Sequence, residues 1–218
     1  MTVRITPSIL NADFSRLNDE IARVASVSDL IHLDIMDDKF VPNFTFDFDR
    51  AGEIIRECPI PVDSHLMVVE PEFAAPRFAE MGSASVTYHF EAATNNQQII
   101  NDVHRLGARV GVAIKPGTSF AVLDDLVDYI DMILIMTVEP GFGGQGFMSE
   151  MLEKVRLARK RLGSNERGVW LQVDGGISQN TIEMAAEAGA DTFVAGSAVY
   201  KAEDPAKMVT LLRELATQ

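Results

Sequence analysis

The stretch IHLDIMDDKFVPN, residues 31–43, combines the apolar residues of a buried strand with charged groups. Ile31, Leu33 and Ile35 alternate with His32 and Asp34. Side chains two residues apart on a strand face the same side, so the apolar residues share one face and His32 and Asp34 share the other. A buried imidazole and carboxylate need partners or a metal to offset lost hydration. We therefore expect this strand to pack one face under helices and to present the other face to a functional site.

Similar apolar runs recur along the chain and alternate with helical patterns, at a spacing of roughly two to three dozen residues, the length of a βα unit. The runs that predict strands lie at residues 3–9, 30–35, 61–67, 85–89, 109–114, 132–136, 169–173 and 192–195. The patterns that predict helices lie at residues 16–27, 49–57, 71–81, 95–106, 120–126, 148–162, 179–188 and 205–216. This alternation predicts a (β/α)₈ barrel, an α/β TIM barrel, as a single domain over residues 1–218. A doubly wound open sheet has the same periodicity and is the alternative.

The composition excludes several classes of function. The chain has 218 residues, a formal net charge of −13 and 47% hydrophobic residues. Such a negative charge argues against nucleic-acid binding and against a role as a cationic protein on a membrane surface. The single cysteine, Cys58, excludes an internal disulfide and suits a reducing cytosol. The N-terminal residues are too polar for a secretory signal, and no run reaches the length of a membrane span. We expect a cytoplasmic protein whose partners include neither nucleic acid nor a membrane.

Polar residues gather where the predicted strands end, which in a barrel is the face that carries the active site. They are Ser8, His32, Asp34, His65, His89, Glu91, Lys115, Glu139 and Asp174. Asp63 and His65 repeat the spacing of His32 and Asp34 on the next strand. Two imidazoles and two carboxylates that converge on one axis are typical ligands of zinc, manganese, iron or cobalt. The alternative is that each histidine is a hydrogen-bonded core or rim residue.

Glycine-rich loops follow the last three predicted strands. They read EPGFGGQGF at 139–147, DGGIS at 174–178 and AGSAVY at 195–200. Barrels commonly hold a substrate phosphate in the loops after strands 7 and 8. Glycine lets backbone N–H groups approach an anion closely, so a phosphate can bind without a basic side chain. The alternative is that these glycines only end strands and form turns. The segment 141–146 is long enough to act as a mobile lid.

Three methionines, Met36, Met67 and Met136, end or follow three of the strands on the same side as the proposed metal. Methionine usually fills a core. The functional alternative is an apolar wall that excludes water around a developing anion.

The motifs PSILNADFSRL, HLDIMDDKFVPN, DSHLMV, MTVEPGFGGQGF, VDGGI and AGSAVY together resemble those of the ribulose-phosphate 3-epimerase family, in order, from about residue 5 to residue 200. The resemblance implies a metal-dependent (β/α)₈ barrel, an isomerase that interconverts D-ribulose 5-phosphate and D-xylulose 5-phosphate. It also implies one divalent metal ion per chain and a homo-oligomer, either a dimer or a hexamer. The small-molecule partner would be a sugar phosphate.

The resemblance implies roles for individual residues. His32, Asp34, His65 and Asp174 would be the metal ligands, and Asp34 and Asp174 the catalytic acid–base pair. Inversion at C3 through a 2,3-enediolate removes a proton on one face and returns one on the other, which requires two opposed carboxylates. The residues expected to contact substrate, chiefly its phosphate in the last loops, are Ser8, Met36, His65, Met67, Met136, Gly143, Gly144, Asp174, Gly175, Gly176, Gly196 and Ser197.

The sequence departs from the family pattern after the second strand, where Asp38 and Lys39 replace the usual glycine and His or Arg. We expect this departure to affect the geometry of the loop at the entrance and not the chemistry.

Three alternative functions remain. D-Allulose-6-phosphate 3-epimerase would use the same central residues. Related barrels that decarboxylate or perform aldol chemistry carry Asp-x-Lys-x-x-Asp after strand 3, but here only Asp63 of that motif is present. A non-catalytic sugar-phosphate binder would not need two opposed aspartates.

Overall fold

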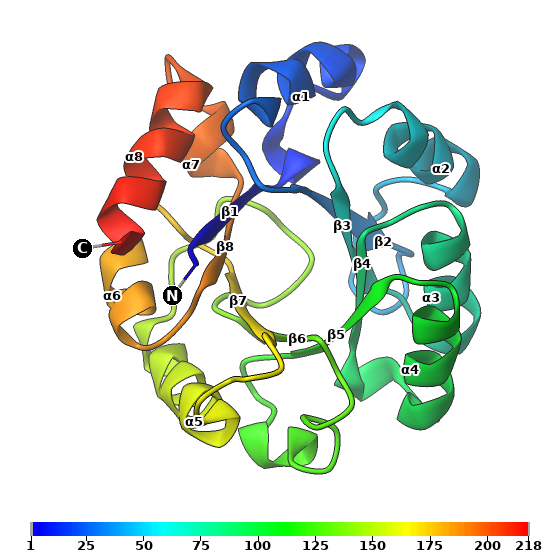
Figure 1. Cartoon of the computed structure of the whole chain (residues 1–218). Coiled ribbons are helices and arrows are strands. Elements are labelled where there is room, and N and C mark those ends of the chain that lie inside the picture. The colour runs from blue at the N-terminus through cyan, green and yellow to red at the C-terminus, as the bar shows by residue number, and fades with distance from the viewer. Residues whose placement is uncertain (1, 218) are drawn as a thin grey trace.

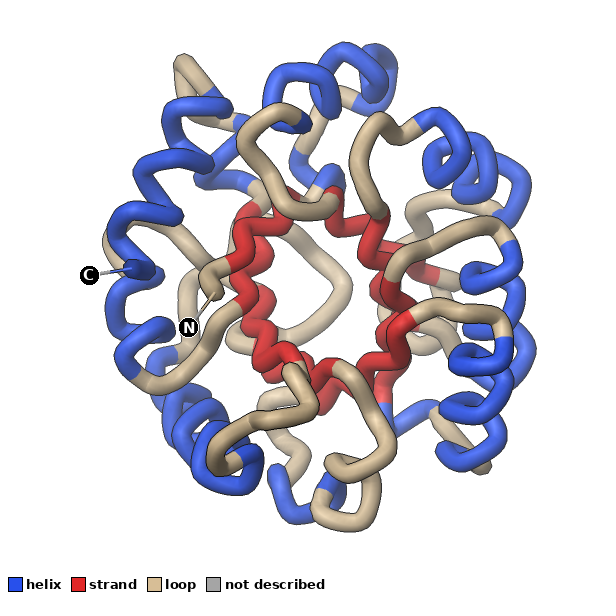
Figure 2. Tube along the Cα trace, viewed as in Figure 1, coloured by secondary structure: helices blue, strands red, loops and turns tan. Residues whose placement is uncertain are grey.

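The structure is a computed structural model that describes residues 2–217, so Met1 and Gln218, the ends of the expected domain, lie outside the described residues. Parallel strands form a ring at its centre, and helices surround the ring (Figures 1 and 2). The strands are β1 Arg4–Pro7, β2 Ile31–Met36, β3 Val62–Met67, β4 Ser85–His89, β5 Arg109–Ile114, β6 Met132–Met136, β7 Trp170–Asp174 and β8 Thr192–Ala195.

The strand order confirms the predicted barrel. The sheet runs β1-β8-β7-β6-β5-β4-β3-β2, so the strands from β2 to β8 pair in chain order and β1 pairs with β8. A parallel bridge between Ser8 and His32, just beyond the end of β1, closes the remaining gap to β2. An open doubly wound sheet would leave two free edges, and this bridge excludes that alternative.

Helices cover the outside of the strand ring. They are α1 Leu17–Ala25, α2 Phe48–Glu57, α3 Pro71–Glu80, α4 Asn96–Arg105, α5 Leu152–Leu162, α6 Ile182–Glu187, α7 Ser197–Tyr200 and α8 Pro205–Thr217. Short 3₁₀ helices lie at Ile9–Asn11, Phe14–Arg16, Phe90–Ala92, Phe120–Leu123 and Ser149–Met151. Within residues 2–217, every helix falls short of the length and apolar character that a membrane crossing requires.

One predicted helix is wrong. Residues 120–126 were expected to be α-helical, but the structure has a 3₁₀ helix at Phe120–Leu123, followed by turns. The amide of Leu126 bonds to the carbonyl of Leu123, three residues back, at 2.8 Å. Asp124 and Asp125 follow directly, and carboxylates are unfavourable at the negative C-terminal end of a helix. The segment is therefore too short and too acidic at its end to continue as an α-helix.

The alternation in β2 is borne out. Ile31, Leu33 and Ile35 belong to the main hydrophobic core between the strands and the outer helices. Full burial of one such side chain contributes about 1.5–3 kcal/mol. His32 and Asp34 face the barrel interior instead and are also buried. The energy from the apolar face holds the strand in the one register that brings both polar groups inside.

Candidate active site and metal centre

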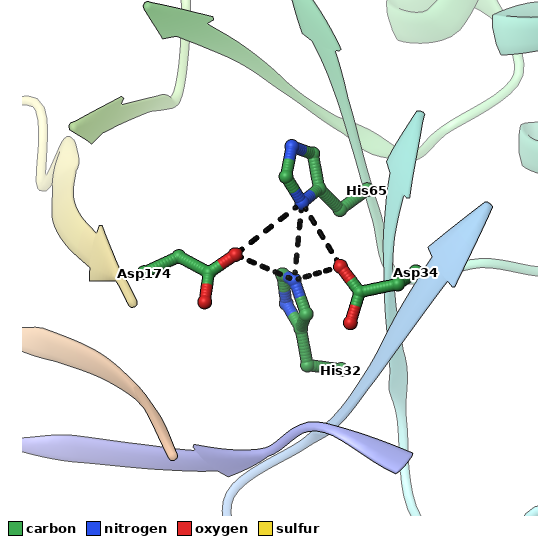
Figure 3. A group of neighbouring side chains, drawn as sticks. All are labelled: His32, Asp34, His65 and Asp174. Carbon is green, nitrogen blue, oxygen red and sulfur yellow. Dashed lines mark hydrogen bonds and ion pairs between the residues drawn. The ribbon is translucent and has the colours of Figure 1, made fainter. Parts of the chain in front are cut away.

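His32, Asp34, His65 and Asp174 meet at the C-terminal mouth of the barrel. One nitrogen or oxygen atom from each of them lies within 4.8 Å of the others. The two histidines and Asp34 come from the adjacent strands β2 and β3, where Asp34 pairs with His65 in register. Asp174 ends β7 on the other side of the ring, and Figure 3 shows the two carboxylates on opposite sides of the two imidazoles. The structure thus brings the predicted set together.

The spacing of the donor atoms fits a metal ion. The His32 Nε2 atom lies 3.4 Å from His65 Nδ1 and 3.4 Å from Asp34 Oδ1. The His65 Nδ1 atom lies 3.2 Å from Asp34 Oδ1 and 3.5 Å from Asp174 Oδ2, and His32 Nε2 lies 3.8 Å from the same Asp174 oxygen. Ligands about 2.0–2.1 Å from a tetrahedral zinc ion are about 3.4 Å apart. The cluster could therefore hold one divalent ion with little rearrangement.

In each imidazole, the ring nitrogen that points away from the cluster lies within hydrogen-bond distance of another residue. This contact directs the other nitrogen, His32 Nε2 or His65 Nδ1, toward the cluster. His32 Nδ1 lies 2.8 Å from Asp63 Oδ2. The Asp63 carboxylate also accepts hydrogen bonds from Ser85 Oγ at 2.6 Å and Gln172 Nε2 at 2.8 Å. Asp63 therefore shares the inward face with His65, as its spacing predicted, but it orients His32 from behind and stays outside the four-residue cluster. Such partners of metal-binding histidines fix the ring and its tautomer.

Burial and neighbouring charges shift the pKa values of the cluster residues in opposite directions. Burial raises the pKa of Asp34, but the charge of His32 and hydrogen bonds with His32 and His65 outweigh it and hold that pKa well below its ordinary value. Burial lowers the pKa of His32, but Asp34 and Asp63 reverse the effect and raise it well above the usual value. The pKa of His65 is also raised, because hydrogen bonds with Asp174 and Asp34 outweigh burial. A metal ion would replace the protons that otherwise balance these carboxylates.

Ser8 fixes the second oxygen of Asp34. The Ser8 hydroxyl donates to Asp34 Oδ2 at 2.6 Å. Ser8 Oγ in turn accepts a hydrogen bond from the amide of Leu10 at 3.3 Å and so caps the 3₁₀ helix after β1. Thr45 adds support, since its hydroxyl donates to the backbone carbonyl of Asp34 at 2.7 Å. Sequence reasoning missed Thr45, because nothing in the sequence places residue 45 beside the end of β2.

A pocket of about 500 Å³ of empty space, partly open to solvent, lies directly above the carboxylates. It is lined by Asp34 and by all but one of the residues expected to contact substrate: Ser8, Met36, Met67, Met136, Gly143, Gly144, Asp174, Gly175, Gly176, Gly196 and Ser197. His65 does not line it, because its ring is fully buried behind the carboxylates. The three methionines are themselves almost fully buried, so they form the apolar floor of the pocket.

The loop at 139–147 covers one side of the pocket and is tied to the rest of the barrel. Asn43 Nδ2 donates to the carbonyl of Gly141 at 2.9 Å, across from the loop that follows β2. Gln145 Nε2 donates to the carbonyls of Glu139 at 2.6 Å and Phe142 at 2.8 Å, which holds the loop in a tight turn. The Phe142 ring is 54% exposed at the outer edge.

Asn11 lines the pocket as well, and sequence reasoning missed it. Its side-chain amide packs against the two glycine loops. A Cβ atom added at Gly143 would lie 2.6 Å from Asn11 Nδ2, and one added at Gly196 would lie 2.4 Å from Asn11 Oδ1. Its position in the loop after β1, three residues beyond Ser8, is the signal that could have identified it.

Asp37 and Asp38, which directly follow β2, lie outside the four-residue cluster. Asp37 Oδ1 accepts the amides of Lys39 and Phe40 at 2.9 and 2.8 Å, and Oδ2 accepts the amide of Val69 at 2.9 Å. Asp37 therefore shapes the loop after β2 and ties it to the loop after β3. Asp38 has a left-handed backbone with φ of 56°, which explains why glycine suits this position.

His89 and Glu91, whose roles the sequence left open, lie behind His65. His89 Nε2 is 2.9 Å from His65 Nε2, and His89 Nδ1 is 3.4 Å from Glu91 Oε2. Burial lowers the pKa of His89 to about 4. Burial alone raises the pKa of Glu91, but the nearby His89 ring and hydrogen bonds from the Thr118 hydroxyl and the Lys115 amide lower it to about 2. His89 is therefore neutral and Glu91 ionised near neutral pH.

Comparison with known proteins agrees with the motifs and the geometry. The ribulose-phosphate 3 epimerase family model matches residues 4–200. A ribulose-phosphate 3-epimerase from Mycobacterium leprae is 48% identical over 212 residues, 97% of this chain and 94% of that protein. The cytoplasmic isoform from Oryza sativa is 39% identical over 216 residues, 97% of this chain and 93% of that protein.

Among solved structures, 3-hexulose-6-phosphate synthase from Salmonella typhimurium superposes with a TM-score of 0.73 at 17% identity, covering 99% of both chains. KGPDC from Streptococcus mutans gives 0.74 at 13% identity, covering 100% of this chain and 98% of that chain. At these identities the likeness shows a shared barrel fold alone. The family match and the full-length relatives decide the assignment: the chain belongs to the ribulose-phosphate 3-epimerase family and is an epimerase.

Proposed function

We propose that this chain interconverts D-ribulose 5-phosphate and D-xylulose 5-phosphate through a 2,3-enediolate, in the pocket above Asp34 and Asp174. One observation carries the proposal. Two carboxylates from strands on opposite sides of the barrel face each other across a pair of imidazoles, at the base of a pocket bounded by glycine loops. The names of the full-length relatives, ribulose-phosphate 3-epimerases, support a ribulose phosphate as substrate and C3 as the carbon that is inverted.

Asp34 and Asp174 would move the protons. A substrate whose C3 lies between them presents one face to each carboxylate, so one removes the C3 proton and the other returns a proton to the opposite face. One carboxylate must therefore start ionised and the other protonated, and the pair exchange these states at each turnover. The Ser8 hydroxyl, 2.6 Å from Asp34, would hold that carboxylate in place during the transfer.

His32, Asp34, His65 and Asp174 would hold one divalent metal ion. Two imidazoles and two carboxylates accept zinc, iron, manganese or cobalt, and availability in the cell selects among them. When bound, such an ion supplies Lewis-acid stabilisation of negative charge on the substrate oxygens. Asp63 would keep His32 Nε2 directed at the ion through its 2.8 Å bond to Nδ1. Metal analysis of the purified protein, with loss of activity on chelation and recovery on adding each ion, identifies it.

The glycine loops would hold the phosphate. Gly175, Gly176, Gly196 and Ser197 lie together in the loops after β7 and β8, and the short helix α7 begins at Ser197. Backbone N–H groups there provide donors that need no basic side chain. Gly143 and Gly144 would close over the substrate from the loop after β6. The methionine floor would keep water from the C3 position during proton transfer.

An assay with two substrates tests the proposal. The purified protein is incubated separately with D-ribulose 5-phosphate and D-allulose 6-phosphate, and epimerisation and solvent proton exchange at C3 are followed by NMR. We expect faster epimerisation of the pentose phosphate. Preference for the hexulose phosphate would reassign the substrate, and absence of exchange with both would favour a non-catalytic binder. The decarboxylase and aldolase alternatives lack support, because the lysine that their motif requires is replaced by His65.

Three further expectations belong to this proposal. The described strands and helices run from Arg4 to Thr217 around one barrel, which supports one domain over residues 1–218. A cytoplasmic location agrees with the description of the rice relative. A homo-oligomer, dimer or hexamer, follows from the family resemblance, and light scattering on the eluting protein measures its mass.

A further inference from the structure

His89 is a buried histidine that the proposed reaction does not use. It ends β4, its side chain is 0% exposed, and its ring lies between two others. The His65 ring meets it edge to edge, with centroids 5.0 Å apart and planes inclined by 28°, and the Phe40 ring packs against it with centroids 4.8 Å apart. Its Nε2 atom lies 2.9 Å from His65 Nε2, within hydrogen-bond distance.

A hydrogen bond between two ring nitrogens contains one proton, so one ring must donate and the other accept. His65 Nδ1 faces Asp34 and Asp174 at 3.2 and 3.5 Å and must offer a lone pair there to bind a metal. The His65 proton then resides on Nε2 and is donated to His89. His89 Nε2 must therefore be unprotonated, and the proton of a neutral His89 ring lies on Nδ1.

Glu91 favours that arrangement. Its Oε2 atom lies 3.4 Å from His89 Nδ1, an electrostatic contact without hydrogen-bond geometry, and that nitrogen has no hydrogen-bond partner within residues 2–217. Glu91 Oε1 is fixed by the amide of Lys115 at 2.7 Å and by the Thr118 hydroxyl. A carboxylate beside Nδ1 stabilises a proton there and leaves Nε2 free to accept.

The loop that fixes Glu91 is itself anchored. Lys154, on α5, directs its ammonium group to the carbonyls of Lys115, Pro116 and Thr118 at 3.1, 2.6 and 2.5 Å. Three short contacts from one ammonium leave the loop after β5 little freedom. The chain of contacts therefore runs from α5 through the β5 loop and β4 to the metal cluster.

We propose that His89 is a positioning residue for metal binding: with the Glu91 carboxylate beside its Nδ1, it accepts the hydrogen bond from His65 Nε2 and so leaves the His65 Nδ1 lone pair directed at the ion. The two imidazole ligands are then oriented by different means. His32 has a carboxylate, Asp63, as its direct partner, whereas His65 reaches its carboxylate through a second imidazole. This inference rests on the proposed metal site and is independent of which sugar phosphate is the substrate.

Two substitutions separate this role from simple core filling. His89→Phe keeps an aromatic ring between His65 and Phe40 but has no acceptor. His89→Gln keeps an acceptor near the position of Nε2 but loses the ring. If His89 only fills space, the phenylalanine variant should bind metal better than the glutamine variant; the proposal requires the opposite order. His104→Phe is the matched control, because His104 is an exposed histidine paired with Asp131, away from the cluster.

The experiment titrates metal-free protein with zinc in competition with a chromophoric chelator, without substrate. We expect His89→Phe to bind zinc about 10- to 100-fold more weakly than the wild type, the size of effect typical of such partners. His89→Gln and His104→Phe should stay within about threefold. Circular dichroism and thermal unfolding of the metal-free variants monitor folding. Wild-type affinity in His89→Phe, or an equal loss in both His89 variants, would overturn the proposal.

A spectroscopic measurement on the wild type keeps the test independent of variant folding. Nitrogen-15 NMR of the zinc-loaded protein reports which ring nitrogens carry protons. We expect His65 to be protonated at Nε2 and His89 at Nδ1; a proton on His89 Nε2 overturns the proposal. Failure of the wild type to bind zinc overturns the metal site and this inference together. Neither measurement uses the sugar phosphate, so a failed epimerase assay is a distinguishable result.

Discussion

The ends of β2 and β7 each supply one carboxylate to the four-residue cluster, but the two carboxylates have different surroundings. Each delivers one carboxylate to the cluster and then leaves the barrel through a turn with left-handed backbone. Asp34, on β2, is buried, and its second oxygen is fixed by Ser8 at 2.6 Å. The Asp174 side chain, at the end of β7, is 17% exposed and meets the imidazoles at 3.5 and 3.8 Å. The β2 carboxylate is therefore held rigidly, whereas the β7 carboxylate borders the open pocket.

The two turns differ in the same way. After β7, Gly175 and Gly176 have φ of 122° and 67°, and a Cβ atom on either would lie within 2.5–2.6 Å of Val138 or Phe147. After β2, Asp38 reaches φ of 56° with a side chain that is exposed. Space restricts the first turn to glycine, while only backbone conformation restricts the second. The crowded β7 turn therefore shapes the pocket, and the β2 turn lies at the rim of the pocket.

The largest expected effect comes from removing either carboxylate. Asp34→Asn and Asp174→Asn should each reduce kcat for epimerisation by about 10²–10⁴-fold, because each removes one of two proton-transfer groups. Each variant should still exchange the C3 proton of one epimer with solvent, and the two variants should differ in which epimer they exchange. NMR in heavy water measures both, with metal content determined for each variant. Normal turnover in either one would remove that residue from the acid–base pair.

Gly176→Ala should have the next largest effect. The added methyl would lie 2.6 Å from the backbone nitrogen of Phe147 and would need a left-handed backbone. Overpacking of this kind costs about 1–3 kcal/mol, and the displaced loop should raise KM for the sugar phosphate. Gly107→Ala is the control, since Gly107 has φ of 82° but nothing within 4 Å. It should lose about 1–2 kcal/mol of stability with KM unchanged. An unchanged KM in Gly176→Ala would count against the phosphate site.

Ser8→Ala should affect the β2 carboxylate alone. A hydrogen bond to a charged group contributes about 1.5–3 kcal/mol, so kcat should fall roughly 10- to 100-fold if that bond holds Asp34 for proton transfer. Steady-state kinetics of the variant measures the change. Ser15→Ala, which removes an exposed hydroxyl bonded to Asp13, should leave kcat unchanged. Equal kcat in Ser8→Ala and wild type would show that Asp34 needs no fixed partner.

The smallest effect is expected at the β2 turn. Asp38→Gly relieves the left-handed strain but increases the freedom of the unfolded chain, and the two contributions should cancel to within about 0.5 kcal/mol. Urea unfolding measures the difference. Epimerase activity should not change, because Asp38 is exposed at the rim. A large loss of activity would place this departure from the family pattern inside the site.

The barrel was predictable because its strands are apolar runs that end in polar residues. Strand β2 was expected at 30–35 and observed at Ile31–Met36, since burial on both faces leaves a clear pattern. The prediction of an α-helix at 120–126 was wrong, because the acidic residues at the end of that segment disfavour an α-helix. The four-residue helix α7 was not predicted, since so short a helix leaves no periodicity.

The cluster itself could be predicted from the positions of its members in the strands. His32 and Asp34 are two residues apart and so share the inward face of β2, His65 lies near the end of β3, and Asp174 ends β7. The partners of its histidines could not be predicted. Whether Asp63 binds the metal or orients His32 depends on which ring nitrogen faces inward, and no spacing rule encodes that. His89 was visible at the end of its strand, but its contact with His65 depends on the lateral register of β3 and β4. Thr45 lies in a loop whose path the sequence pattern does not specify.

Conversion of D-ribulose 5-phosphate in heavy water by the metal-loaded protein tests the two-carboxylate account most directly. Proton removal on one face and return from the other require that the new C3 proton come from a carboxylate in exchange with solvent. We expect D-xylulose 5-phosphate that carries deuterium at C3. Product that keeps the original C3 proton, or no product at all, would contradict the account.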